Sequence, residues 1–321
     1  MALLSDVPAV LRHYGAWGFT KRVWREIEED HTFTWSAALA YSWLFALFPF
    51  LIFLMTLFPY LPDGAEEGMY QSIRDVFPDQ AADTVCTNIQ HALGRMKSDP
   101  TRGQLVPRVL GLGLALWAAS AGMAMTMAAL DQCYEVTQGR PFYVQRPLAV
   151  GMTVAVSSLV LLVVCMLPLG AFLHHWLDER YPNLRGSGLL VLYDVARWSL
   201  GLLFLIAALS ILYQKGPSIR RRWTWLSPGT VFCVAVWIGL GLAFKLYVTR
   251  YGRYNDTYGT VGGVVVLLLF FYIDAVVLLV GAQINSEIDF HVLKVDRGSR
   301  DYRAAESVHR PRRRRRGSKS T

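Results

Sequence analysis

Charged residues are scarce in this chain of 321 residues. They make up only 17% of the sequence, whereas 53% is hydrophobic, and the mean hydropathy is +0.30. A typical soluble domain carries about 25% charged residues. This composition excludes a disordered scaffold and a secreted disulfide module, and it argues against a soluble enzyme.

Cysteine and histidine are also few, with four and seven residues respectively. The cysteines are far apart and no C-x-x-C pair occurs, which argues against a disulfide framework and a thiolate metal site. The only adjacent histidines, His174 and His175, fall on the expected outer side of the membrane. We therefore predict no catalytic residue, no metal site and no cofactor, and we do not expect an enzyme.

Six long apolar stretches dominate what is present. They cover residues 35–60, 105–130, 148–173, 189–213, 226–249 and 258–287. A helix needs about 20 apolar residues to cross the hydrocarbon core of a bilayer. The stretches are continuous rather than alternating, so helices rather than barrel strands are expected. The sequence predicts an all-α polytopic membrane protein with six transmembrane helices in a bundle.

The chain divides into a lead-in at residues 1–34, a membrane domain at 35–290 and a basic tail at 291–321. In the lead-in, apolar residues recur at helical spacing beside basic ones, namely Val10, Tyr14, Trp17, Trp24 and Ile27. This pattern is typical of a helix lying on the inner membrane surface, or of a soluble helix packed on the cytoplasmic end of the bundle. Spaced apolar residues after Pro78 predict a helix within the outer loop 61–104.

The distribution of basic residues predicts the orientation. If both termini are cytoplasmic, the inner segments hold 21 Lys and Arg and the outer segments hold 8. This is the direction of the positive-inside rule. The tail ends in a block of five arginines, Arg312, Arg313, Arg314, Arg315 and Arg316. We expect this disordered tail to contact anionic lipid headgroups rather than nucleic acid, because no aromatic residues accompany it to stack on bases.

Two segments carry a family resemblance. One is TWSAALAYSWLFALFPFLIFL at Thr34 to Leu54, which contains Tyr41 and Pro49. The other is YGRYNDTYGTVGGVVVLLLFFYIDAVVLLVGAQINSEI at Tyr251 to Ile288. They are similar to the first-span and last-span signatures of the YihY/BrkB family of bacterial inner-membrane proteins, and the likeness covers roughly residues 18–290. The family usually has Glu where this chain has Gln283, which puts in doubt any role that needs a carboxylate there.

The resemblance implies a multi-pass protein of the bacterial inner membrane. Members carry ribonuclease BN or virulence labels, and transport of a lipid or solute has been suspected for the family.

Asp274 is the sharpest functional candidate in the residues themselves. It lies about 13 residues, roughly 20 Å, inside the last span, where an ionised carboxylate costs on the order of 2.5–3.5 kcal/mol. Such a residue either faces a substrate pathway or is a hydrogen-bonded structural group between helices. On a helical wheel it shares a narrow sector with Gly263, Phe270, Gly281 and Asn285, whereas Gln283 and Glu287 share a second face.

Further candidates lie at the outer ends of the fourth and fifth spans. Arg197 and Lys245 share a depth, and Asp194 precedes Arg197 by three residues. They either line an outward-opening polar cavity, or Lys245 extends to the membrane surface and Asp194 pairs with Arg197. Tyr258, Gly259 and Gly263 open the last span, where small residues allow close helix packing or local unwinding. Asp131 is expected as a hydrated residue at the end of the second span.

These features favour a translocator or exporter of a lipid or small polar solute. A non-transporting scaffold or envelope-integrity factor is the alternative. A ribonuclease is the third hypothesis, and the scattered histidines argue against it. Membrane lipids are the expected partners, and the sequence leaves homo-oligomerisation open.

Overall fold

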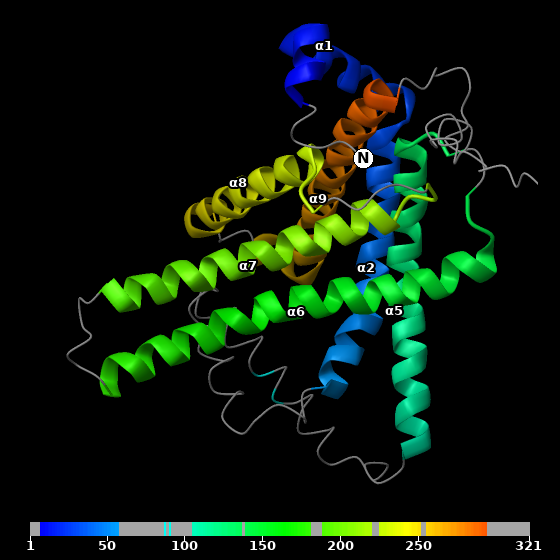
Figure 1. Ribbon diagram of the computed structural model, residues 1–321. Coiled ribbons are helices and arrows are strands. Elements are labelled where there is room, and N and C mark those ends of the chain that lie inside the picture. Colours follow the sequence, from blue (N-terminus) through cyan, green and yellow to red (C-terminus); the bar gives the residue numbers. More distant parts are fainter. Residues whose placement is uncertain are drawn as a thin grey trace, which may run out of the picture.

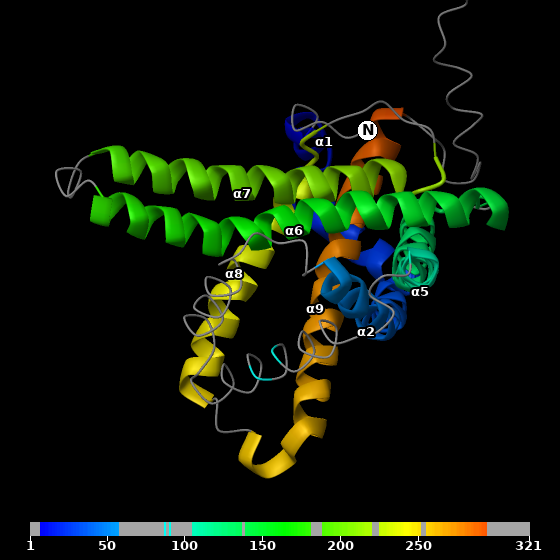
Figure 2. The same cartoon turned by 90° about the horizontal axis from the view of Figure 1, so that it is seen from below.

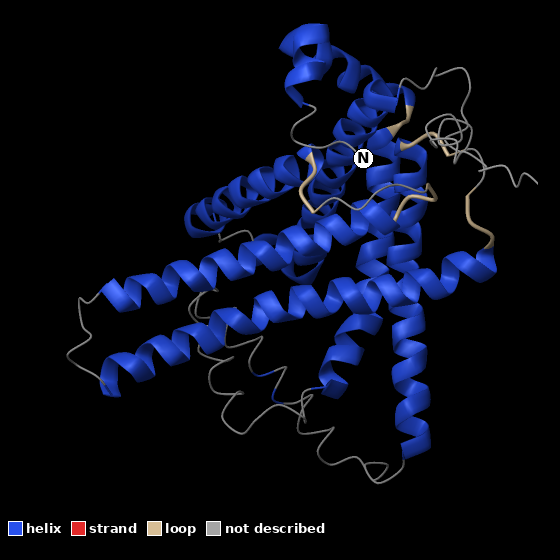
Figure 3. Cartoon of the chain, in the orientation of Figure 1, coloured by secondary structure: helices blue, strands red, loops and turns tan. Residues whose placement is uncertain are grey.

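The computed structural model describes residues 7–57, 87, 90, 105–136, 139–180, 188–219, 225–251 and 255–293. Within these ranges the chain is helical, with short turns and no strand (Figure 3). The all-α prediction is therefore confirmed for the described part. The predicted helix of the outer loop 61–104 and the tail beyond Leu293 lie outside the described residues.

The described part of each predicted apolar stretch falls in one long helix, apart from residues 226 and 227, which precede the fifth of these helices. The helices are α2 (Thr32–Leu57), α5 (Leu105–Cys133), α6 (Phe142–Arg180), α7 (Gly188–Lys215), α8 (Pro228–Tyr251) and α9 (Asn255–Leu293), and α1 (Val7–Glu29) precedes them. Among the described residues, five of these helices are long and apolar enough to cross a membrane, namely α2, α5, α6, α7 and α9. In α8 the described apolar segment, Pro228–Ala243, is shorter.

The helices pair along the chain rather than forming a parallel bundle. α2 packs against α5, α6 against α7, and α8 against α9, while α9 also packs along α2. Figures 1 and 2 show the α6–α7 pair crossing the direction of α2 and α5 steeply. In Figure 2 the ribbons of α8 and α9 lie apart along most of their length. The predicted bundle of six transmembrane helices stays a prediction, since five of the described helices are long and apolar enough to cross a membrane.

Among the residues whose burial is described, the buried ones of these six helices lie at one common end. They come from the first half of α2, the second half of α5, the start of α6, the last turns of α7, the start of α8 and the second half of α9. Successive helices therefore contribute alternately their first and last portions, as antiparallel neighbours must. One core cluster joins these portions, including Leu39, Leu130, Ala149, Tyr213, Cys233 and Leu279. Beyond this end many apolar side chains are exposed.

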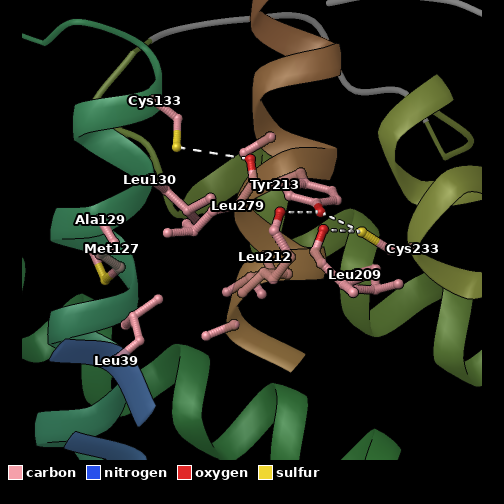
Figure 4. Close-up of a cluster of buried hydrophobic side chains, with 14 of the residues drawn as sticks. Leu39, Met127, Ala129, Leu130, Cys133, Leu209, Leu212, Tyr213, Cys233 and Leu279 are labelled. Atoms are coloured by element: carbon pink, nitrogen blue, oxygen red, sulfur yellow. Dashed lines mark hydrogen bonds between the residues drawn. The ribbon is translucent and has the colours of Figure 1, made fainter. Parts of the chain in front are cut away.

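Helix α9 forms the centre of this core (Figure 4). Its carbonyl groups at 277, 278 and 279 accept hydrogen bonds from three other helices. The Tyr213 hydroxyl of α7 donates to the Leu278 carbonyl at 2.8 Å, and the Cys233 thiol of α8 donates to the Val277 carbonyl at 3.2 Å. The Cys133 thiol of α5 makes a longer contact of 3.9 Å with the Leu279 carbonyl. Both of these cysteines are free thiols.

Small residues allow this close approach. A methyl group added at Gly281 of α9 would overlap the Cys233 sulfur and the Tyr213 hydroxyl oxygen, and one added at Gly229 of α8 would overlap the Gly281 carbonyl oxygen. Since lipid provides no hydrophobic force between helices, close packing of this kind is what holds membrane helices together. Gly281 and Gly229 therefore set how closely α7, α8 and α9 approach each other.

Helix α1 docks on the end of α9 (Figure 1). Val10 of α1 packs against Ile288, and Ile27 is also buried. Gly15, at φ 71° and ψ 156°, breaks the helix into two parts, a conformation that favours glycine. Trp17 and Trp24 are 81% and 54% exposed. The five spaced apolar residues thus do not share one membrane-facing side, because Val10 packs on α9 and Ile27 is buried within the protein.

Replacing Gly281 by Ala is expected to lower the stability of the protein by about 1–3 kcal/mol, because the added methyl group overpacks the contact with Cys233 and Tyr213. Thermal unfolding in detergent measures this effect. Gly239 of α8 is the matched control, since nothing lies within 4 Å of a methyl group added there. Equal melting temperatures for the two variants would contradict the assigned contact.

Candidate functional site

Polar side chains gather at the converged end of the helices, where four connections join segments far apart in sequence. They link α8 to α9, the α1–α2 turn to α9, α1 to α9, and the end of α5 to the turn after α7. A separate carboxylate, Asp274, lies further along α9.

Asn285 joins α8 to α9. Its side chain is fully buried, and its Oδ1 accepts a 2.8 Å hydrogen bond from the backbone N–H of Gly229. Gly229 lies in the first turn of α8, where N–H groups have no partner within the helix. Ser227 caps the same turn by accepting a 3.2 Å hydrogen bond from the Thr230 N–H. Asn285 therefore fixes the start of α8 on α9, and it is held in this contact rather than beside Asp274.

Gln283 joins α9 to the turn between α1 and α2. Its Nε2 donates a 2.7 Å hydrogen bond to Asp30 Oδ2, and both side chains are buried. Gln132 of α5 also hydrogen bonds to Asp30. Burial raises the pKa of the Asp30 carboxyl above its ordinary value of 3.8, although the hydrogen bonds from Gln283 and Gln132 oppose the shift. Gln283 thus supplies a neutral donor to a desolvated acid.

Glu287, one turn further along α9, joins it to α1. Arg22 Nε donates a 2.7 Å hydrogen bond to Glu287 Oε1, and the glutamate side chain is only 3% exposed. The Arg22 guanidinium also lies 4.5 Å over the ring of Tyr14. The prediction that Gln283 and Glu287 share a face of α9 is confirmed, because both side chains contact the α1 region.

The end of α5 is tied to the turn after α7. Asp131 accepts hydrogen bonds from the Ser218 hydroxyl, at 2.7 Å, and from the Ser218 N–H. Arg140 donates to the carbonyl oxygens of Gly216 and Pro217 at 2.9 and 2.7 Å, which satisfies groups at the end of α7. Burial lowers the pKa of Arg140 from its ordinary value, and Asp131 opposes this shift. The expectation that Asp131 is merely hydrated is wrong, because its carboxylate holds this turn.

Asp274 differs from these residues. It is half-buried in α9, seven residues before Gly281. Among the described residues, none forms a hydrogen bond or an ion pair with its carboxylate. Its neighbour Phe271 lies 6.3 Å from the Trp43 ring of α2, so this level of α9 still contacts α2. A carboxylate without a protein partner inside an apolar helix is available to a ligand or a proton.

The outer polar residues are only partly described. Arg197 of α7 is partly buried, and its guanidinium lies 5.7 Å from the ring centre of Trp198. Its Nε is buried and has no partner in the described part of the protein. Asp194 lies in α7 and Lys245 in α8, but their side chains are outside the described residues. The predicted pairing of Asp194 with Arg197 and the shared cavity with Lys245 therefore stay predictions.

The remaining motif residues lie in α2 and α9. Tyr41 is 61% exposed and its ring lies 4.6 Å from that of Phe45, while Pro49 sits inside the continuous helix α2. Tyr258, Gly259 and Gly263 fall in the first part of α9, where their surroundings are outside the described residues. Among the residues whose positions are described, no group of three or more His, Cys, Asp and Glu could hold a metal ion.

Several polar partners were not predicted from the sequence. Asp30, Arg22, Gln132 and Arg140 lie outside the apolar stretches or at their ends, where charged residues are expected to be hydrated. One feature of the sequence did point to such partners. The last apolar stretch ends in Gln283, Asn285 and Glu287, and polar side chains of this kind need hydrogen-bond partners when they are buried. The sequence does not state which segments supply them.

Comparison with known proteins gives the family. The family model described as "Virulence factor BrkB" matches residues 23–303. The chain belongs to the BrkB family. This confirms the resemblance carried by the two end segments, and it makes the chain an integral membrane protein of that family.

The relatives of this BrkB-family protein cover most of its length. It is 30% identical over 252 residues to "Putative ribonuclease-like protein YfkH" of Bacillus subtilis (strain 168), which covers 78% of this chain and 88% of YfkH. It is 22% identical over 294 residues to a UPF0761 membrane protein of Aeromonas salmonicida (strain A449), covering 87% and 91% of the two chains. A UPF0761 membrane protein of Verminephrobacter eiseniae (strain EF01-2) is 27% identical over 298 residues, 89% of this chain and 64% of that relative. No solved structure matches.

Replacing Asp30 by Asn is expected to stabilise the protein more at pH 7 than at pH 4. The raised pKa means that the folded protein binds the Asp30 proton more tightly than the unfolded chain does. The wild type therefore loses stability as pH rises from about 4 through the folded pKa, whereas Asn has no proton to lose. Melting temperatures of both proteins in detergent across this range measure the difference, and parallel curves would contradict it.

Replacing Gln283 by Glu is expected to destabilise the protein by about 1–3 kcal/mol at pH 7, because a second carboxylate then faces Asp30 in place of a donor. The loss should shrink at pH 5, and it should also shrink in the Asp30→Asn background. A thermal double-mutant cycle measures the coupling. Gln145→Glu, at a partly exposed position in α6, is the control, and an uncoupled cycle would show that the two residues do not interact.

Proposed function

We propose that this BrkB-family protein is an inner-membrane translocator that moves a lipid or a small polar solute. In this proposal the chain crosses the membrane six times, with both termini in the cytoplasm, and Asp274 lies on the substrate pathway. The observation that carries the proposal is the division of the helices into a packed end and a divergent end, with an unpartnered carboxylate beyond the packed core.

The packed end fits the cytoplasmic side. Its turns contain Asp30, Arg140 and Ser218, and they belong to the segments in which the basic residues of the sequence concentrate. Buried hydrogen bonds and the Arg22–Glu287 pair close this end. On the opposite side the α6–α7 pair stays together but points away from α2 and α5 (Figure 1), and the described side chains there are largely exposed. An arrangement closed at one side and open at the other is what alternating access to a substrate requires.

Asp274 fits a pathway role better than a structural one. Three buried polar residues of α9, Gln283, Asn285 and Glu287, each hold a neighbouring segment. Asp274 holds no described segment, yet an intramembrane carboxylate is costly to keep. The protein therefore carries this cost without a gain in packing, as expected for a residue that binds a substrate or a coupling proton.

The proposal assigns no hydrolytic chemistry to the protein. The ribonuclease-like name belongs to YfkH. In this protein three acidic residues of the packed end, Asp30, Asp131 and Glu287, are engaged in contacts between helices and turns. Those contacts leave them as supports of the fold rather than as groups presented to RNA.

A strain that depends on the protein tests the role of Asp274. Asp274→Asn is expected to reduce complementation of a deletion strain to a small fraction of the wild-type level, at equal amounts in the membrane, because the amide cannot carry the charge or a transferable proton. Glu28→Gln, an exposed change in α1, should complement fully. Full complementation by Asp274→Asn would remove the pathway role and favour a scaffold.

A further inference from the structure

The part of α1 that follows Gly15 has one uncovered side. Trp17 and Trp24 are largely exposed, and Lys21 and Arg25 are exposed as well. Because successive residues of a helix are rotated by about 100°, these four side chains share a sector of about 100°, which we call the tryptophan face. The buried residues of this part lie on the other side of the helix, namely Val23, Glu26 and Ile27. Helix α1 therefore has one side docked against α9 and α2 and an opposite side that the protein leaves uncovered.

The tryptophan face continues into the uncovered side of α2. Only Asp30 and His31 separate the two helices. The ring of Trp24 lies 6.5 Å from the ring of Phe33 in the first turn of α2, in an edge-to-face arrangement. Phe33 begins a line of exposed residues that continues along α2 in steps of three or four, namely Ala37, Tyr41, Phe45 and Phe48. This spacing places the line on one side of the helix.

The exposed side of α2 is a lipid-facing surface. Four of its five residues are aromatic, and α2 is long and apolar enough to cross a membrane. Exposed apolar surface on such a helix contacts acyl chains. Phe33 lies where the span begins, so the adjoining Trp24 lies at the level of the lipid headgroups. Tryptophan is typical of this level because its ring is apolar and its N–H group is polar.

The charges of the tryptophan face favour anionic headgroups. Lys21 and Arg25 form no ion pair with a described residue. Glu28 lies on the same side, where its Oε1 accepts a 2.8 Å hydrogen bond from the Trp24 indole N–H. Two basic groups thus stand beside one carboxylate that is already engaged. Exposed tryptophan with Lys and Arg is typical of a helix that lies in the membrane surface, and the basic groups attract anionic lipids.

We infer that the tryptophan face of α1 binds anionic phospholipid headgroups. Trp17 and Trp24 lie in the headgroup layer, and Lys21 and Arg25 contact the lipid phosphates. The docked side of α1 holds α9 through the ion pair between Arg22 and Glu287. Helix α1 is therefore bound to the membrane on one side and to the membrane helices on the other. This inference does not depend on the proposed translocator function.

Photocrosslinking of the full-length protein in lipid nanodiscs tests the contact. One variant carries p-benzoylphenylalanine in place of Trp17, and a matched variant carries it in place of Tyr41 on the lipid-facing side of α2. Irradiation in nanodiscs of phosphatidylcholine and phosphatidylglycerol is expected to give lipid adducts at both positions, which mass spectrometry identifies. Adducts at position 41 show that the probe captures lipid.

The absence of lipid adducts at position 17 would overturn the inference, because the tryptophan face would then lie away from the membrane. Crosslinking of position 17 to a second copy of the chain would overturn it as well, in favour of a protein contact.

The lipid composition of the adducts at position 17 tests the role of charge. At low salt and with equal amounts of the two lipids, phosphatidylglycerol should be enriched about fivefold for each of the two basic residues. The enrichment should fall at high salt. Lys21→Gln combined with Arg25→Gln should abolish the enrichment while leaving the adducts themselves. Glu28→Gln is the control on the same side of α1, and it should keep or raise the enrichment because it removes a negative charge.

Equal capture of the two lipids at position 17 without further substitution would overturn the recognition of anionic headgroups. Enrichment that persists in the variant lacking both basic residues would overturn the assignment of Lys21 and Arg25.

Discussion

The close approach of α7 and α8 to the backbone of α9 is the contact on which the rest of the structure depends. Gly281 leaves room for Cys233 and Tyr213, and Gly229 leaves room for the carbonyl of Gly281. Only at this distance do the α9 carbonyls accept the side-chain hydrogen bonds of the other helices. In a lipid environment, such short-range packing and hydrogen bonding replace the hydrophobic force that assembles soluble proteins. A wider crossing would lose both.

The polar residues of α9 divide into two groups by position. Gln283, Asn285 and Glu287, which lie beyond Gly281, are buried and hydrogen bond to other segments, which makes the converged end a fixed base. Asp274 lies before Gly281, where the helices begin to separate, and it holds no described partner. One half of α9 therefore holds neighbouring segments in place, whereas the side chains of the other half are largely exposed. This division favours a protein that keeps one end closed while the other admits a substrate.

Much of the fold was predicted from the sequence because bilayer thickness imposes a length on apolar segments. Each of the six apolar stretches lies in a helix, and the two end motifs correctly indicated the family. The helical wheel also separated the face of Gln283 and Glu287 from that of Gly281 and Asn285. The expectation for Asp131 failed because the sequence of one helix does not show that Ser218 lies opposite it. For the lead-in, packing on α9 agrees with the second alternative, a helix docked on the end of the membrane helices.

The sequence by itself determined that the chain is helical, membrane-bound and a member of the BrkB family. Composition and the length of apolar stretches do not depend on which segments meet in the fold, so both can be determined from the sequence alone. Tertiary structure alone decided that Asp30 meets Gln283 across 253 positions of chain, that Asn285 holds the start of α8, and that Asp274 is left without a described partner. These outcomes depend on which helix ends converge, and that is settled by side-chain shape and close packing between segments distant in sequence.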